Sequence, residues 1–225
     1  MSRYDCGWDA GVVPINVRLA GHNREHFLDD GLLAVNLMGS PCAGKTSILE
    51  AVARAAKNPR RIVAMTAEPA KENDANRLMA AGIRSKAIEM RRAAPLDAEL
   101  VQRTLHHLDA GDAEYLFIES CGNLLGPVCD FGQSLNVVAL SITEGEEKAL
   151  HFPEMFEKAD LVLLTKADLL PHLPFINVKA IMDALAQAMP SPRVISMSCR
   201  TGLGVEAFLR WLEAARAAAL EKLLV

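Results

Sequence analysis

A glycine-containing loop between a predicted strand and a predicted helix is the feature that most constrains the fold of this chain. The apolar run 32–38 is followed by Gly39 and, four residues later, by Gly44-Lys45-Thr46, so the loop has the spacing G-x-x-x-x-G-K-T. An amphipathic segment begins directly after it. In this order, backbone N–H groups and a helix N-terminus face one point and suit the negative charge of nucleotide phosphates. We therefore expect an α/β fold of the phosphate-loop NTPase type.

We expect different residues of this loop to contact different parts of a bound nucleotide. Lys45 would place a positive charge beside the β- and γ-phosphates, and we expect it to take part in catalysis. The hydroxyl of Thr46 is suited to hold Mg²⁺. Contacts with the nucleotide are predicted for the whole loop, which consists of Gly39, Ser40, Pro41, Cys42, Ala43, Gly44, Lys45, Thr46 and Ser47.

Composition bounds the class of protein. The 225 residues carry a net charge of −4, which offers no broadly basic surface for nucleic acid or an anionic membrane. No apolar run approaches the roughly 20 residues that cross a bilayer. The cysteines are odd in number and include no C-x-x-C pair, which favours reduced thiols in the cytoplasm over a disulfide framework; they are Cys6, Cys42, Cys121, Cys129 and Cys199.

Strands and helices alternate along the chain. Short apolar runs separated by helical periodicity predict a mostly parallel sheet with helices on both faces. Residues 1–19 show no clear period, so we expect an arm that is partly disordered, followed by a single domain over residues 20–225. The predicted strands are 32–38, 61–66, 115–119, 136–142, 161–164 and 193–197.

Glu119 stands at the carboxyl end of the predicted strand 115–119. Ligands in such sheets bind at the carboxyl ends of the strands. A carboxylate placed there can enter the Mg²⁺ shell or orient water, so we assign it a catalytic and metal-binding role. The polar segment 67–78 lies where a nucleotide-sensing switch is expected.

A second loop predicts which base is bound. Thr165-Lys166-Ala167-Asp168 directly follows a buried strand and has the form T-K-x-D. The carboxylate of Asp168 can accept two parallel hydrogen bonds from guanine, whereas adenine offers the wrong pattern, and the stem of Lys166 can stack over the base. Ser198 and Cys199 begin a stretch similar to the S-A-x-x-G loop that supports the guanine carbonyl. These motifs fall in order at strand ends, which indicates a GTPase.

Histidines offer a less specific signal. His22 and His26 would share one face of a short helix, and this spacing is compatible with metal binding. Surface histidines with no ligand are far commoner, and both interpretations stay open at this point.

Several stretches of this sequence resemble the HypB family, GTPases that assist nickel insertion into [NiFe]-hydrogenases. The resemblance runs from about residue 23 to 212 and is strongest in N-L-M-G-S-P-C-A-G-K-T (36–46), E-N-D-A-N-R (72–77), L-F-I-E-S-C-G-N-L (116–124) and residues 140–171. It implies a SIMIBI-type GTPase fold, bound GTP or GDP with Mg²⁺, and a homodimer that forms on GTP binding. The implied partners are a metalloenzyme precursor or a nickel chaperone.

The metal site of that family is not intact here. Its members usually place a Cys-His pair just before L-D-A and a Cys before a proline after G-N-L, at the dimer interface. This chain has Ala94, Pro95 and Gly126 at those positions, and none of these side chains is a metal ligand. The family's Ni²⁺ or Zn²⁺ site therefore cannot form in its usual way. Cys121 and Cys129 lie close by in sequence and offer thiols that either replace part of it or remain inert.

Other departures concern the nucleotide. Cys42 replaces a glycine, and Glu68 stands where the family has an aspartate that helps to hold Mg²⁺. Lys71 replaces a switch threonine, and Thr165 replaces the asparagine of N-K-x-D. The resemblance thus implies a GTPase of low turnover with Thr46, Glu68 and Glu119 around Mg²⁺. The alternatives are a metal-free GTPase paralogue that assembles another metalloenzyme, and a scaffold that binds nucleotide without hydrolysing it.

Overall fold

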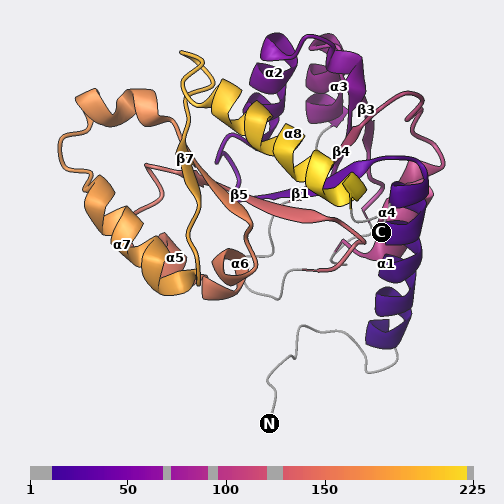
Figure 1. Ribbon diagram of the computed structural model, residues 1–225. Helices are drawn as coiled ribbons and strands as arrows, with labels where there is room; N and C mark the ends of the chain where they lie inside the picture. The colour runs from indigo at the N-terminus through magenta and orange to yellow at the C-terminus, as the bar shows by residue number, and fades with distance from the viewer. Residues whose placement is uncertain (1–11, 68–71, 91–95, 121–128, 222–225) are drawn as a thin grey trace.

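The computed structural model describes residues 12–67, 72–90, 96–120 and 129–221. Within these residues seven strands form one parallel sheet in the order β3-β2-β4-β1-β5-β6-β7 (Figure 1). The predicted α/β class is confirmed. The strands are β1 (Leu33–Met38), β2 (Ile62–Thr66), β3 (Arg84–Ala87), β4 (Tyr115–Glu119), β5 (Leu135–Ser141), β6 (Leu161–Thr165) and β7 (Val194–Ser196).

Helices cover both faces of the sheet (Figure 1). One apolar cluster joins the first face to α2 (Lys45–Ala55), α3 (Glu72–Ala80) and α8 (Val205–Glu221). The other face carries two clusters. One lies under α1 (Val12–Asp29) and α4 (Ala98–Leu105), and the other under α5 (Lys148–His151), α6 (Pro153–Glu157) and α7 (Val178–Ala188). The 3-10 helices η1 (Pro59–Arg61) and η2 (Ala167–His172) complete the described elements.

Burial on both faces explains the apolar runs of the central strands. Every residue of β1, β2, β4 and β6 is buried. A parallel strand covered by helices on both sides has no solvent face, so its sequence shows no alternation of polar and apolar residues. In the described residues no helix combines the length and apolar character that a membrane crossing requires.

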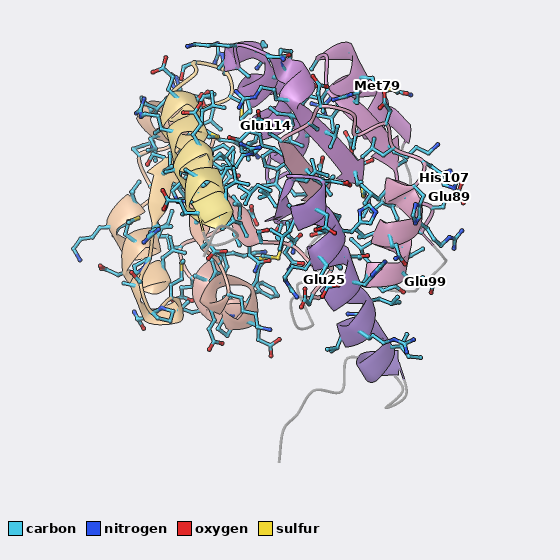
Figure 2. The ribbon with its side chains drawn as sticks, turned by 45° about the vertical axis from the view of Figure 1, so that its right-hand side comes forward. Glu25, Met79, Glu89, Glu99, His107 and Glu114 are labelled. Carbon is cyan, nitrogen blue, oxygen red and sulfur yellow. The ribbon has the colours of Figure 1, made fainter. Side chains whose placement is uncertain are left out.

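The N-terminal segment differs from the expectation. Helix α1 begins at Val12, so residues 12–19 are helical rather than part of an arm. The tertiary contacts explain this. The side chain of Asn23 is buried and donates to the carbonyls of Ala98 and Phe131, both at 2.9 Å. The amide of Asn16 bridges Ala98 N–H and the carbonyl of Asp130. Figure 2 shows α1 beside α4.

Strand β3 is absent from the sequence prediction. Its residues Arg84 to Ala87 are mostly polar and only partly buried, because this edge strand pairs with β2 alone. Charged residues on an edge strand discourage pairing with other chains and also remove the apolar signal. Beside β3 lies a hollow lined by Lys86, Glu89, Arg103 and His107, among others; Figure 2 labels Glu89 and His107.

Candidate functional site

The phosphate loop connects β1 to α2 at the carboxyl edge of the sheet. Gly39 has φ 154°, and a Cβ atom there would lie 2.5 Å from the carbonyl oxygen of Ala139 in β5. Gly44 has φ 99° and forms the N-cap of α2. Glycine alone meets both needs, the close approach and the left-handed backbone, without strain. Cys42 takes φ 64° in the same loop, a conformation that costs a residue with a Cβ atom.

Lys45 lies inside this loop. Its side chain donates to the carbonyls of Gly39 and Ser40, at 3.2 Å each, and the residue is only 3% exposed. The hydroxyl of Ser40 is buried and has no hydrogen-bond partner among the described residues. A buried ammonium and a buried hydroxyl within one glycine-rich turn fit the oxygens of a phosphate.

Thr46, in the first turn of α2, is hydrogen-bonded to Glu119 at the end of β4. The Thr46 hydroxyl donates to Glu119 Oε1 at 2.7 Å, and both residues are buried. A hydroxyl and a carboxylate are hard oxygen donors of the kind that Mg²⁺ takes, so the pair fits that ion. The third predicted ligand, Glu68, lies outside the described residues.

The predicted base loop, residues 165–168, is joined to the phosphate loop by a hydrogen bond. Thr165 Oγ1 donates to the carbonyl of Ala43 at 2.7 Å. Lys166 follows with φ 60° as the N-cap of η2, and Asp168 lies in the first turn of η2. The hydroxyl of Thr165 thus makes a bond between the two loops, and the left-handed backbone at Lys166 turns the chain into η2.

The S-C-x-x-G stretch lies next to that loop. Ala167 N donates to the carbonyl of Met197 at 3.1 Å, which brings the two stretches together. Ser198 is fully buried, and its hydroxyl accepts from Thr201 N at 3.2 Å. Burial raises the pKa of the Cys199 thiol, so the neutral thiol is favoured there. The predicted base-binding residues therefore gather at one edge.

A charged contact that the sequence analysis did not assign joins α2 to α3. Arg77 makes two hydrogen bonds of 3.0 Å to the carboxylate of Glu50 and one of 3.1 Å to Asp74. Its Nη2 also lies 3.4 Å from the hydroxyl of Ser47, in the first turn of α2. The hydrogen bond to Glu50 is the main cause that raises the pKa of Arg77. The string E-N-D-A-N-R contains Asp74 and Arg77, but its spacing alone does not reveal the contact with α2.

The candidate metal ligands are the histidines of α1 and α4 and the cysteines near β4 and β5. Within the described ranges no group of three or more His, Cys, Asp or Glu side chains has an arrangement that could hold a metal ion. The ring centroids of His22 and His26 lie 6.4 Å apart, and the ring centroid of His106, the C-cap of α4, lies 6.3 Å from that of His26. Cys129 is partly buried. Four positions lie outside the described residues: Ala94, Pro95, Cys121 and Gly126.

A family model, curated sequences and solved structures all relate this chain to the same group of proteins. Residues 33–192 match the family model described as CobW/HypB/UreG, nucleotide-binding domain. The hydrogenase maturation factor HypB of Rhizobium leguminosarum bv. viciae is 41% identical over 207 residues, covering 92% of this chain and 69% of that protein.

Two solved structures share the fold over most of their length. HypB from Archaeoglobus fulgidus superposes with a TM-score of 0.81 at 31% identity, covering 90% of this chain and 99% of that one. HypB from Helicobacter pylori in complex with nickel gives a TM-score of 0.83 at 28% identity, with coverages of 91% and 96%.

Proposed function

Because this chain belongs to the HypB family and carries the CobW/HypB/UreG nucleotide-binding domain, we propose that it binds and hydrolyses GTP as a hydrogenase maturation factor. Its work would be to assist nickel insertion into a [NiFe]-hydrogenase. The observation that carries the GTP assignment is the 2.7 Å hydrogen bond from Thr165 to Ala43. It joins the loop suited to guanine to the loop suited to phosphates.

The residues would divide the work as follows. Backbone N–H groups of the phosphate loop and the ammonium of Lys45 would bind the phosphates. Thr46 and Glu119, with Glu68, would hold Mg²⁺, an ion that neutralises charge on the phosphates during phosphoryl transfer. Lys166 and Asp168 would select guanine, supported by Ser198 and Cys199. Glu119 would also orient the attacking water.

Hydrolysis would act as a switch. Loss of the γ-phosphate removes the contacts that hold switch segments in such proteins, and this biases an equilibrium between two arrangements. We propose that the two arrangements are a monomer and a GTP-dependent homodimer. The dimer would meet a metalloenzyme precursor or a nickel chaperone.

A second candidate has a specific observation in its favour. Ala94, Pro95 and Gly126 occupy the positions that the family resemblance assigns to metal ligands, and their side chains offer none. A GTPase that assembles a metalloenzyme without itself binding the metal would need no ligands there. Equilibrium dialysis with Ni²⁺ or Zn²⁺ separates the two candidates. Stoichiometric binding that is lost in Cys121→Ser and Cys129→Ser favours metal handling, and no binding favours the metal-free factor.

The GTPase assignment itself is tested by calorimetric titration with GTP, ATP and xanthosine triphosphate. We expect tight binding of GTP only, and loss of that binding in Lys45→Ala. Equal affinity for ATP, or unchanged binding in Lys45→Ala, would overturn the assignment. A single-turnover GTPase assay then distinguishes a hydrolase from a scaffold that only binds nucleotide.

A further inference from the structure

Asn36 is a polar residue in a strand that is otherwise apolar. All six residues of β1 are buried, and Asn36 is 1% exposed. An amide in such a place gives up its water and must find hydrogen bonds within the protein. An apolar side chain of similar volume would fill the same space without that requirement. The partners of Asn36 therefore indicate what the amide does.

The hydrogen bonds of Asn36 connect β1 to the chain on both of its sides. Asn36 Oδ1 accepts from the hydroxyl of Ser120, just past the end of β4, at 2.8 Å. Asn36 Nδ2 donates to Asn136 Oδ1 in β5 at 3.3 Å. Gln133 Nε2 donates to the same oxygen at 3.1 Å. This row of amides runs between the apolar cluster under α1 and α4 and the one under α5 to α7.

Ser120 links this row to the Thr46–Glu119 pair. It directly follows Glu119, whose carboxylate accepts from Thr46 on the α2 side. Successive side chains of a strand point to opposite faces, so Ser120 turns toward Asn36 while Glu119 turns toward Thr46. Ser120 N also donates to the carbonyl of Leu37 at 3.1 Å. Two bonds to β1 thus fix the peptide after Glu119 and the direction in which its carboxylate leaves the strand.

We propose that Asn36 is a positioning residue for the Thr46–Glu119 pair, acting through Ser120 and held in place by Asn136. The inference rests on the proposed function, because it assumes that this pair takes part in binding Mg²⁺. Nothing in the phosphate-loop or base-loop motifs assigns Asn36 or Asn136 such a role.

The test measures how much Mg²⁺ tightens nucleotide binding. A fluorescent GDP analogue is titrated into the full chain in Mg²⁺ and in EDTA, and the ratio of the two dissociation constants is compared among variants. Ser120→Ala removes the donor to Asn36, and Asn136→Leu removes the acceptor. Both should reduce the Mg²⁺-dependent gain in affinity about tenfold, with affinity in EDTA unchanged.

Asn136→Asp is the matched control, since it keeps oxygen acceptors at the same place, and it should keep the gain within about twofold of the original chain. Asn36→Leu removes both hydrogen bonds of the amide. If this variant fails to fold, the comparison of Asn136→Leu with Asn136→Asp tests the proposal, since Asn136 is partly exposed.

A loss of unfolding free energy with the Mg²⁺ gain intact would show that the row of amides is only structural and would overturn the proposal. If the original chain shows no Mg²⁺ gain, the magnesium site in the proposed function fails together with it. If the original chain shows the gain and the variants keep it, only the positioning role fails.

Discussion

The hydroxyl of Thr165 donates a 2.7 Å hydrogen bond to the carbonyl oxygen of Ala43. Both residues are buried, so water cannot replace this bond when it is removed. Thr165 comes before the residues suited to guanine, and Ala43 belongs to the phosphate loop. The hydroxyl of Thr165 therefore makes a direct, buried bond between the two loops, in addition to the sheet that carries them.

Thr165→Val tests this dependence, because valine keeps the shape and removes the hydroxyl. A buried carbonyl without its donor costs about 1–3 kcal/mol, so urea unfolding should show a loss of about that size. We also expect GDP binding to weaken about tenfold, the equivalent of about 1.4 kcal/mol. Thr165→Ser keeps the donor and should stay close to the original chain in both measurements. Identical values for the valine and serine variants would contradict the linking role.

Asp168→Asn should change the choice of base. The carboxylate accepts two parallel hydrogen bonds from guanine, whereas an amide offers one acceptor and one donor, the pattern that xanthine matches. Hydrogen bonds to a charged group contribute about 1.5–3 kcal/mol each, so GTP affinity should fall by about a hundredfold. Calorimetric titration should show xanthosine triphosphate gaining affinity in the variant. An unchanged preference for GTP would remove Asp168 from the base site.

Cysteine labelling should follow exposure and pKa. Cys42 is exposed in the phosphate loop, whereas Cys199 is partly buried and burial raises the pKa of its thiol. Only the thiolate reacts, so a raised pKa keeps Cys199 in the unreactive form at pH 8 and moves its reaction to higher pH. We expect iodoacetamide to label Cys42 before Cys199, and the labelling of Cys199 to speed up only at a pH above the usual pKa of a thiol.

Peptide mass spectrometry after timed labelling measures both sites in one sample. GDP with Mg²⁺ should protect Cys42, since the phosphates would cover its loop. Faster labelling of Cys199 than of Cys42 at pH 8 would contradict the packing of the S-C-x-x-G stretch.

Gly132 tests the contact between α1 and the chain that precedes β5. Its φ is +94°, and a Cβ atom there would lie 2.6 Å from the carbonyl oxygen of Ala20 and 2.7 Å from Arg24 N. Gly145 has the same φ with nothing within 4 Å. Gly145→Ala should therefore cost about 1–2 kcal/mol from backbone strain alone. Gly132→Ala should cost a further 1–3 kcal/mol, because the methyl group has no room.

Urea unfolding followed by circular dichroism measures the two costs side by side. Because the backbone strain is matched, the difference between the variants reports the packing of α1. Equal costs would mean that α1 does not lie against Gly132.

Much of the architecture could be predicted from local pattern. The predicted strand 115–119 has the same bounds as β4, and the run 61–66 differs from β2 by one residue. Strands buried on both faces carry uninterrupted apolar runs, which locate them directly. The order of the motifs along the chain then placed Lys45, Glu119 and Asp168 at the same edge, because carboxyl ends of parallel strands meet there.

The sequence alone therefore determined the fold class, the family and the lack of ligand side chains at 94, 95 and 126. Only the tertiary structure decided that α1 reaches back to Val12, that β3 completes the sheet edge, and that Asn36 joins three strands. Apolar periodicity reports burial within one segment, whereas a hydrogen bond between residues 84 positions apart leaves no periodic trace in either segment. Polar contacts of this kind exist only once the packed sheet has brought their two ends together.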